Sequence, residues 1–301
     1  MGAVRVWVSG ARGFVGSWLV PRLARDGCDV VASDRDLDVT DAAGVDAAIA
    51  QAAPDALVHL AARASVAASF GAPESVARTN YLGTLHVLRA AARHAPRARV
   101  LFVSSGEIYG GADREQPLDE DAPLAPGSPY ARSKAAADLL AGAFAARGLD
   151  VVRARSFNHT GPGQTDAYAA PAFARQLAEM QLGRREPVLH VGNLAAVRDF
   201  LDVRDVVDAY ARLLDRRVPA GAYNVASGVA RPIAEILELL SAAAGVAPRI
   251  EVDSARWRPT QALVGDARRL RRATGWSPAI PLETTLRDLL DDWRARLSEK
   301  P

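Results

Sequence analysis

Short apolar runs alternate with longer amphipathic stretches along the first half of the chain. Apolar runs of this length, bounded by turn residues, predict buried strands, and the stretches between them predict helices. The predicted strands are 4–8, 29–33, 56–60, 99–104 and 150–155, and the predicted helices are 17–25, 76–94 and 129–146. Because strands that alternate with helices form a parallel sheet covered on both faces, this half predicts a doubly wound α/β domain with ligand sites at the carboxyl ends of its strands.

The pattern is looser beyond about residue 160. Helices are predicted at 171–182 and 233–244, and a short strand at 188–191. The segment 199–214 and the strand 223–225 are able to return to the first sheet, which predicts a discontinuous domain boundary. We therefore expect one domain of residues 1–160 with 199–225, and a smaller α/β domain of residues 161–198 and 226–301.

The composition argues against several classes of protein. Basic and acidic residues nearly cancel, 37 against 35, so no broad field favours nucleic acid or an anionic membrane, and a local cluster of arginines must hold any anionic ligand. The first residues are too glycine-rich for a signal peptide, and no apolar stretch of about 18 residues exists. The single Cys28 excludes an internal disulfide, and the histidines show no metal-ligand spacing. We expect a cytoplasmic protein that binds neither nucleic acid, membrane nor metal.

Three glycines, Gly10, Gly13 and Gly16, stand between the first predicted strand and the helix that follows it. Glycine there permits a tight turn and the close approach of a pyrophosphate, which the N–H groups at the start of the helix would face. A glycine-rich turn without a ligand is the alternative, but the place between strand and helix favours a dinucleotide. The predicted contacts are the loop residues Gly10, Arg12, Gly13, Phe14, Val15 and Gly16.

The end of the second predicted strand bears on the choice of dinucleotide. Asp34 is placed to accept hydrogen bonds from the adenosine ribose hydroxyls and would repel a 2′-phosphate, which favours NAD(H). Arg12 and Arg35 lie close by in sequence, and either is able to pair with the 2′-phosphate of NADP(H). Both cofactors stay open, with a mild preference for NAD(H). Asp38 and Val39 are candidate adenine contacts, although an ordinary turn explains Asp38 nearly as well.

Tyr130 and Lys134 are four residues apart, on one face of a predicted helix. An ammonium beside a phenol stabilises the phenolate, so Lys134 is expected to lower the pKa of Tyr130 and to hydrogen-bond the nicotinamide ribose. Lys134 is one of two lysines in an arginine-rich chain, which weakly favours a role that needs a compact ammonium. Ser105 follows a predicted strand and is placed to bind the substrate oxygen. A tyrosine and a lysine at this spacing are common on helix surfaces, but together with the glycine loop they indicate a catalytic pair.

These motifs together resemble the extended short-chain dehydrogenase/reductase superfamily over essentially the whole chain. The resemblance implies a Rossmann domain that binds NAD(P), a smaller C-terminal domain that binds a nucleotide-sugar, and a catalytic triad of Ser105, Tyr130 and Lys134. It also implies a homodimer through helices 76–94 and 130–146, although one chain could cover those alanine-rich faces itself. The residues that carry the resemblance are the glycine loop, Leu60-Ala61-Ala62, Asn80 as a structural support, Ser105 and Tyr130-x-x-x-Lys134.

The second half resembles GDP-4-keto-6-deoxymannose reductases and their neighbours, the GDP-mannose 4,6-dehydratases. The stretches 155–164 and 191–205 carry this likeness. It implies that Asn158 and Arg198 contact the diphosphate and sugar of a GDP-sugar, and that Arg258 clamps the diphosphate. Guanidinium forks suit a diphosphate, which agrees with these roles. Ion pairing at the surface is the alternative for both arginines.

Glu107 leaves two reactions open. Related dehydratases carry a glutamate two residues after the hydroxyl residue, as here after Ser105, and use it to remove the C5 proton. The short chain and the compact stretch after Asp34 resemble the reductases instead. We expect reduction by NAD(P)H of the C4 ketone of a GDP-4-keto-6-deoxyhexose to a GDP-6-deoxyhexose, of the rhamnose or 6-deoxytalose type. The alternatives are a GDP-sugar 4,6-dehydratase or 4-epimerase with bound NAD, and a non-catalytic protein that senses a dinucleotide.

Overall fold

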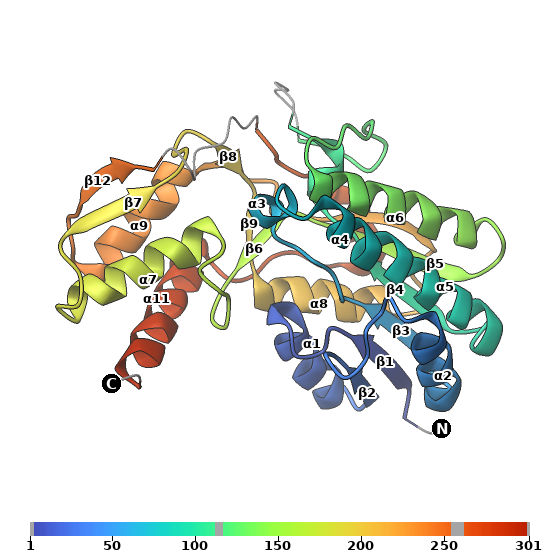
Figure 1. Cartoon of the computed structure of the whole chain (residues 1–301). Helices are drawn as coiled ribbons and strands as arrows, with labels where there is room; N and C mark the ends of the chain where they lie inside the picture. Colours follow the sequence, from blue (N-terminus) through green and yellow to red (C-terminus); the bar gives the residue numbers. More distant parts are fainter. Residues whose placement is uncertain (1–2, 112–116, 254–261, 300–301) are drawn as a thin grey trace.

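The computed structural model of the protein describes residues 3–111, 117–253 and 262–299 (Figure 1). At its centre lies a parallel sheet of six strands, β1 (Arg5–Ser9), β2 (Asp29–Ser33), β3 (Ala56–His59), β4 (Arg99–Val103), β5 (Asp150–Ser156) and β10 (Gly221–Val225). The strand order is β10-β5-β4-β3-β1-β2, so the connections run in opposite directions from β1. In such sheets ligands bind outside the carboxyl ends of the strands, at the point of reversal.

Helices cover both faces of this sheet (Figure 1). One face carries α1 (Phe14–Arg25) and α8 (Val203–Leu213), and the other carries α2 (Ala42–Ala52), α5 (Gly83–His94) and α6 (Pro129–Ala145). Alternate residues of a strand point to opposite faces. Accordingly, Val6 and Val8 of β1 pack with α1 and α8, whereas Trp7 packs with α2 and α5. This is the doubly wound α/β fold that the sequence predicted.

The single helix predicted over 76–94 is interrupted in the structure. A short helix α4 (Pro73–Ala77) leads into a π-helical turn η1 (Arg78–Leu82), and α5 follows. The interruption surrounds Asn80, whose buried side chain is held by residues far away in sequence. π-Turns inside helices are frequent at functional sites. The apolar pattern shows no sign of this turn because its cause is tertiary.

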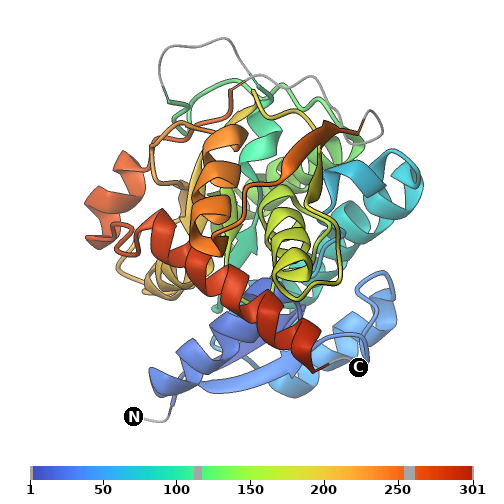
Figure 2. The ribbon, with the colours of Figure 1, turned by 90° about the vertical axis from the view of Figure 1, so that its left-hand side faces the viewer.

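A smaller lobe stands at the carboxyl edge of the sheet. Its helices α7 (Ala169–Gln181), α9 (Ile233–Ala244) and α11 (Leu282–Ser298) pack against one another (Figure 2). A two-stranded parallel sheet of β7 (Val188–Val191) and β12 (Arg249–Val252) flanks them. Apolar side chains from all three helices, including Phe173, Leu237 and Leu289, form one core that is separate from the cores of the large sheet.

Short strand pairs join the two lobes. β6 (Asn158–Thr160) runs parallel to β9 (Phe200–Asp202), and β8 (Val197–Arg198) runs antiparallel to β11 (Arg231–Pro232). Three short helices complete the described structure, α3 (Val66–Ser69), the 3-10 helix η2 (Gly106–Tyr109) and α10 (Arg268–Thr274). Over the described ranges, the helices are too short or too polar to cross a membrane.

Candidate active site

The glycine loop forms a tight turn between β1 and α1. Gly10 has a φ of +69°, and a Cβ at this position would lie 2.8 Å from the backbone nitrogen of Ala61. A Cβ at Gly16 would lie 2.3 Å from the carbonyl oxygen of Gly10, so both positions require glycine. Gly13 precedes α1, and no side chain in the described part of the chain caps this helix end. The first N–H groups of α1 therefore face outward as a cradle that fits a diphosphate.

The carboxylate of Asp34 holds the glycine loop against the end of β2. It accepts hydrogen bonds from the backbone N–H groups of Arg12 at 2.7 Å and of Arg35 at 2.8 Å. The guanidinium of Arg12 pairs with Asp36 at 2.8 Å, and both side chains are exposed. The structure thus brings Asp34, Arg12 and Arg35 together. Asp34 is a candidate partner for the ribose of NAD(H), and the two arginines are candidate partners for the 2′-phosphate of NADP(H).

The other predicted cofactor contacts differ in exposure. Leu60, Ala61 and Ala62 follow β3 beside the glycine loop and are half-buried. Asp38 is exposed, and its carboxylate accepts a hydrogen bond from the backbone of Thr40 at 2.9 Å, as in an ordinary turn. Val39 is buried in the core beneath α5, so its side chain is engaged in packing.

Ser105 and Tyr130 meet at the carboxyl end of β4. Ser105 directly precedes η2, and its hydroxyl is hydrogen-bonded to the phenol of Tyr130. Tyr130 lies in the first turn of α6, which begins at a proline and is capped by Ser128, whose hydroxyl accepts from the N–H of Ala131 at 3.1 Å. Both catalytic candidates are buried, so their geometry is set by the sheet and by the start of this helix.

Lys134 lies one turn further along α6, with its ammonium directed at the end of β4. Nζ donates to the carbonyl oxygen of Val103 and lies 4.7 Å from the centroid of the Phe102 ring. Burial lowers the pKa of Lys134 to about 8, although the charge of Asp138 opposes this shift. The ammonium is therefore protonated at neutral pH and loses its proton in mildly alkaline solution.

The expected lowering of the Tyr130 pKa is wrong. Burial raises the pKa of Tyr130 well above its ordinary value, and the nearby Tyr168 and Glu107 raise it further. The hydrogen bond with Ser105 opposes this rise without cancelling it. Helical spacing places a lysine near the phenol but says nothing about burial, which is the larger effect. The Tyr130 phenol consequently stays protonated at neutral pH.

A cavity of about 180 Å³ lies between the lobes and includes two of the predicted substrate residues, Asn158 and Arg198. Nε of Arg198 lies 4.0 Å from Oε1 of Glu107, which follows Ser105 on η2. Burial raises the pKa of Glu107, and the charge of Arg198 opposes this rise. Arg198 thus connects the cavity that Asn158 lines with Glu107, whose charge acts on Tyr130.

Three residues near these groups were not among the predicted site residues. Tyr168 lines the cavity at the start of α7 and acts electrostatically on Tyr130. His159 also lines it, and its ring stacks on Phe14 of the glycine loop with centroids 6.1 Å apart. Ser104 has a buried hydroxyl at the end of β4, without a partner among the described residues. His159 lies in the stretch 155–164 that carries the family resemblance, and Ser104 ends the predicted strand 99–104, whereas no pattern in the sequence singled out Tyr168.

Two further residues singled out in the sequence have different outcomes. Asn80 is buried and its side-chain amide donates to the hydroxyl of Ser133 on α6 at 2.9 Å, so it supports the helix that carries Tyr130. Arg258 lies outside the described residues. Within the described ranges, no three His, Cys, Asp or Glu side chains are placed to hold a metal ion.

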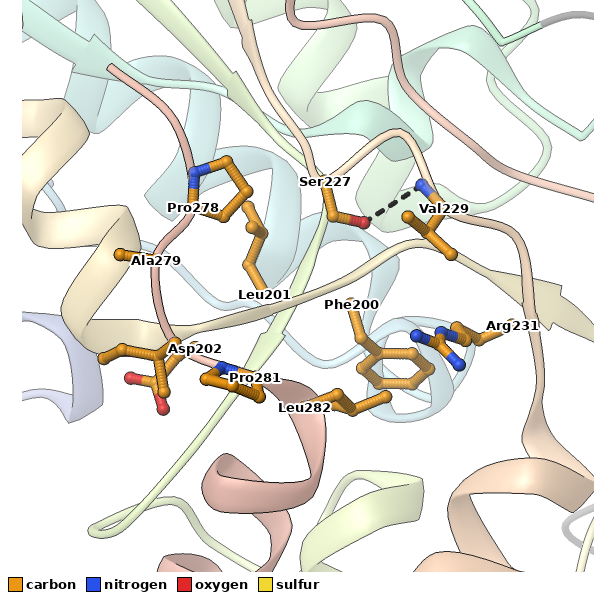
Figure 3. A pocket seen from close by; sticks show the side chains of 11 residues that line it. Phe200, Leu201, Asp202, Ser227, Val229, Arg231, Pro278, Ala279, Pro281 and Leu282 are labelled. Atoms are coloured by element: carbon orange, nitrogen blue, oxygen red, sulfur yellow. Dashed lines mark hydrogen bonds between the residues drawn. The ribbon is translucent and has the colours of Figure 1, made fainter.

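A larger cavity, of about 260 Å³, shares Phe200 with the first one. Figure 3 shows the Phe200 ring with Arg231 and Leu282 on one side of this cavity, and Asp202 on another. The guanidinium of Arg231 is engaged in an ion pair with Glu235. The larger cavity contains none of the predicted catalytic or substrate residues. The smaller one is lined by the substrate candidates Asn158 and Arg198, although not by Ser105, Tyr130 or Lys134, so we assign the substrate side of the site to the smaller cavity.

Comparison with known proteins agrees with this geometry. The sequence model of a family described as GDP-mannose 4,6 dehydratase matches residues 34–289. A GDP-6-deoxy-D-mannose reductase of Pseudomonas aeruginosa is 40% identical over 251 residues, which cover 82% of this chain and 83% of that protein.

Solved structures extend the likeness to three dimensions. A structure of RMD from Pseudomonas aeruginosa complexed with NADPH superposes with a TM-score of 0.89 at 36% identity, over 98% of this chain and 100% of the other. A UDP-glucose 4-epimerase of Thermus thermophilus, in complex with NAD, superposes with a TM-score of 0.87 at 30% identity, over 97% and 99%. This fold therefore accommodates both forms of the nicotinamide cofactor in similar proteins.

Proposed function

The chain belongs to the GDP-mannose 4,6-dehydratase family, and we propose that it acts in this family as a reductase. Its substrate is a GDP-4-keto-6-deoxyhexose, whose C4 ketone is reduced with NAD(P)H to a GDP-6-deoxyhexose of the rhamnose or 6-deoxytalose type. The similarity to a GDP-6-deoxy-D-mannose reductase over most of both chains supports this choice. The observation that carries the proposal is the meeting of the buried Ser105, Tyr130 and Lys134 side chains at the carboxyl end of β4, because reduction of a ketone requires a proton donor at the new alkoxide.

The residues of the glycine loop suit the cofactor that this reaction requires. The N–H groups at the start of α1 would hold the diphosphate, and Asp34 would face the adenosine ribose. The hydroxyl of Ser104 and the ammonium of Lys134 would hold the nicotinamide end. The nicotinamide, when bound, supplies a hydride to C4 of the sugar.

The catalytic side chains handle the proton and the oxygen. Tyr130 gives its phenolic proton to the C4 oxygen as the alkoxide develops, and the hydroxyl of Ser105 donates a hydrogen bond to the same oxygen. The ammonium of Lys134 stabilises the phenolate that Tyr130 leaves behind, and its lowered pKa suits it to supply a proton for the recovery of the phenol.

The substrate side of the cavity suits an anionic sugar nucleotide. Arg198 would pair with the diphosphate or a sugar oxygen, and Asn158 would hydrogen-bond the sugar. We extend the diphosphate contact to Arg258 on the ground of the sequence likeness alone. Glu107 keeps its place beside Arg198, so the same cavity also favours a second candidate function, the dehydration of GDP-mannose with bound NAD.

Two incubations distinguish these functions. Purified protein is given GDP-4-keto-6-deoxymannose with NADH or with NADPH, and cofactor oxidation is followed by its absorbance together with the sugar product. We expect one equivalent of cofactor to be oxidised for each ketone reduced, and oxidation of neither cofactor would overturn the reductase assignment. In parallel, GDP-mannose is incubated without reductant. Its conversion to a 4-keto sugar would assign the dehydratase reaction instead.

We also propose a cytoplasmic homodimer that pairs through α5 and α6. Leu82, the last residue of η1 before α5, and Leu139 of α6 are 37% and 61% exposed, and pairing through these helices would cover them. Light scattering of the purified protein should give the mass of two chains. The charge introduced by Leu139→Glu should shift this mass toward one chain, and an unchanged dimer would place the interface elsewhere.

A further inference from the structure

A line of buried polar side chains connects the glycine loop to the catalytic helix. It passes through His59 at the end of β3, whose side chain is deep between the sheet and α5 and only 2% exposed. Polar groups in such a place must be hydrogen-bonded to one another, because water does not reach them. The members of this hydrogen-bond network are Ser9, His59, Thr84 and Asn80, and each of them is at most 2% exposed.

The donors and acceptors that are available determine the direction of each hydrogen bond in this network. The hydroxyl of Thr84 donates its single proton to the carbonyl oxygen of Asn80 at 2.6 Å. Its contact with Nε2 of His59 at 3.1 Å therefore requires that Nε2 carry a proton and donate it. In a neutral ring, Nδ1 then has a lone pair, which accepts from the hydroxyl of Ser9 at 2.7 Å. The Ser9 oxygen in turn accepts from the N–H of Ala61 at 3.3 Å.

The hydrogen-bond network continues through the side chain of Asn80 to the catalytic helix α6. The amide of Asn80 donates to the hydroxyl of Ser133 at 2.9 Å, and Ser133 donates to the carbonyl oxygen of Tyr130 at 2.7 Å. A hydrogen bond from the backbone N–H of Arg63, at 2.8 Å, fixes the orientation of this amide. The π-helical turn η1 allows Asn80 to use its backbone carbonyl and its side chain in the same network.

The surroundings of His59 favour the neutral ring that this network requires. Burial lowers the pKa of His59 to about 3, and the charge of Lys134 lowers it in the same direction. The other neighbour of the ring is Phe102, at 6.1 Å between centroids, and it offers no charge. A neutral imidazole with one donor and one acceptor is thus matched on both sides, by Thr84 and by Ser9.

We propose that His59, in its neutral Nε2-protonated form, is a positioning residue that holds the catalytic helix in register with the cofactor loop. Its anchor at the loop is the backbone of Ala61, the group against which Gly10 packs so closely that no Cβ fits. Its anchor at the helix is the carbonyl of Tyr130, reached through Asn80. The inference rests on the proposed function in one respect, namely that Tyr130 is the proton donor.

The tautomer of His59 provides a test that needs no substrate. Two-bond ¹⁵N–¹H spectra of histidine-labelled protein distinguish Nε2–H from Nδ1–H rings. We expect one of the five histidines to remain an Nε2–H tautomer from pH 8 to pH 5, with Thr84→Ser preserving that signal and His59→Gln removing it. A His59 ring that is protonated at Nδ1, or on both nitrogens at pH 7, would overturn the proposal whatever the enzyme reduces.

The functional test replaces the central link. Thr84→Val keeps the shape of the side chain but removes the hydroxyl, whereas Thr84→Ser keeps the hydroxyl. We expect kcat to fall about 10- to 100-fold in the valine variant, as for small displacements of a catalytic group, and to stay within about threefold of the parent in the serine variant. The Kd for the cofactor and the KM for the ketone should change by less than about twofold in both.

The comparison of the two variants separates positioning from stability. Equal kcat for Thr84→Val and the parent would show that the hydrogen-bond network does not position the catalytic helix. Equal losses of kcat in the valine and serine variants would show that packing, rather than hydrogen bonding, matters at this position. Should Thr84→Val not fold, His59→Gln replaces it, because a glutamine amide reaches Thr84 but leaves Ser9 without its acceptor. A loss of kcat at unchanged cofactor Kd is then expected, and an unchanged kcat would overturn the proposal. A parent protein that reduces no ketone would refute the proposed function, while the tautomer still decides the state of His59.

Discussion

The two sides of the active site are built differently. On the sheet side, Ser105, Tyr130 and Lys134 are buried at the end of a central strand and on a helix of 17 residues. On the lobe side, Asn158 and Arg198 are half-buried on strands of only three and two residues. The sheet side is held by a core and a hydrogen-bond network, and the lobe side by short strand pairs. The comparison indicates that reaction geometry and substrate recognition are supported by separate parts of the fold.

This separation has a consequence for mutations. A group that acts on the reacting atoms changes the transition state and therefore kcat, whereas a group that holds the substrate equally before and during reaction changes KM. Changes on the sheet side should lower kcat, and changes on the lobe side should raise KM. Each of the experiments below either breaks or sharpens this division.

The largest effect is expected from Tyr130→Phe, which removes the proton donor and keeps the ring. kcat should fall about 10²- to 10⁴-fold, the usual contribution of a general acid, with cofactor binding intact. Steady-state kinetics and cofactor fluorescence measure the two quantities. Tyr223→Phe is the control, because it removes another buried phenol, bonded to the carbonyl oxygen of Pro219 at 2.8 Å, away from the site. Comparable kcat values for the two variants would remove Tyr130 from the mechanism.

On the lobe side, Arg198→Met should raise KM for the GDP-sugar about 10- to 100-fold, because a charge-assisted hydrogen bond contributes about 1.5–3 kcal/mol. kcat should change much less. Arg231→Met is a matched control, since Arg231 is the register partner of Arg198 on the neighbouring strand but lines the larger cavity. A larger loss from the Arg231 change would move the substrate to that cavity and contradict our assignment.

The pH dependence tests the sheet side more gently. The pKa of Lys134 lies at about 8, so its ammonium is present below that pH and is lost as the pH rises through it. If the ammonium stabilises the Tyr130 phenolate as we propose, kcat should fall above pH 8, approaching about tenfold per pH unit. Lys300→Met, which alters the other lysine, should leave this decline unchanged. A constant kcat between pH 7 and pH 10 would exclude this role of Lys134.

The smallest effect concerns the cofactor. Asp34→Asn keeps an acceptor for the glycine loop but removes the charge that would face a 2′-phosphate. The ratio of the Kd for NADPH to that for NADH should fall by about threefold to tenfold, in line with about 1 kcal/mol for one polar contact. Asp36→Asn, which affects the partner of the Arg12 guanidinium, is the comparison. An unchanged ratio in Asp34→Asn would mean that Arg35 or Arg12 decides the preference.

Much of the sheet was predictable because its signals are local. The strand 4–8 and the glycines after it are adjacent in sequence, so the loop geometry follows from a few residues. The helix α2 was missed because its Ala42–Ala52 segment is largely alanine and has little contrast between faces. The π-turn at Asn80 was missed for a different reason, since its partners Arg63 and Ser133 belong to other elements.

The candidate site divides in the same way. The spacing of Tyr130 and Lys134 was sufficient to place both on one helical face, but not to give the sign of the Tyr130 pKa shift, which depends on burial. The approach of Glu107 to Arg198 depends on how η2 packs against β8, so the sequence around either residue does not predict it. Tyr168 and His59 carried no motif of their own. Their positions emerge only when the lobes and the sheet are assembled.

The paired strands between the lobes also bear on how ligands enter. The chain crosses from one lobe to the other more than once, at β6 and again at β9, and Arg198 forms a further bridge with Leu263. Two lobes that are connected at several points are expected to move as one rigid body rather than to open and close about a hinge. Calorimetry should accordingly show one melting transition for the whole chain. Ligands should bind in a cleft that is already formed, without closure of the two lobes.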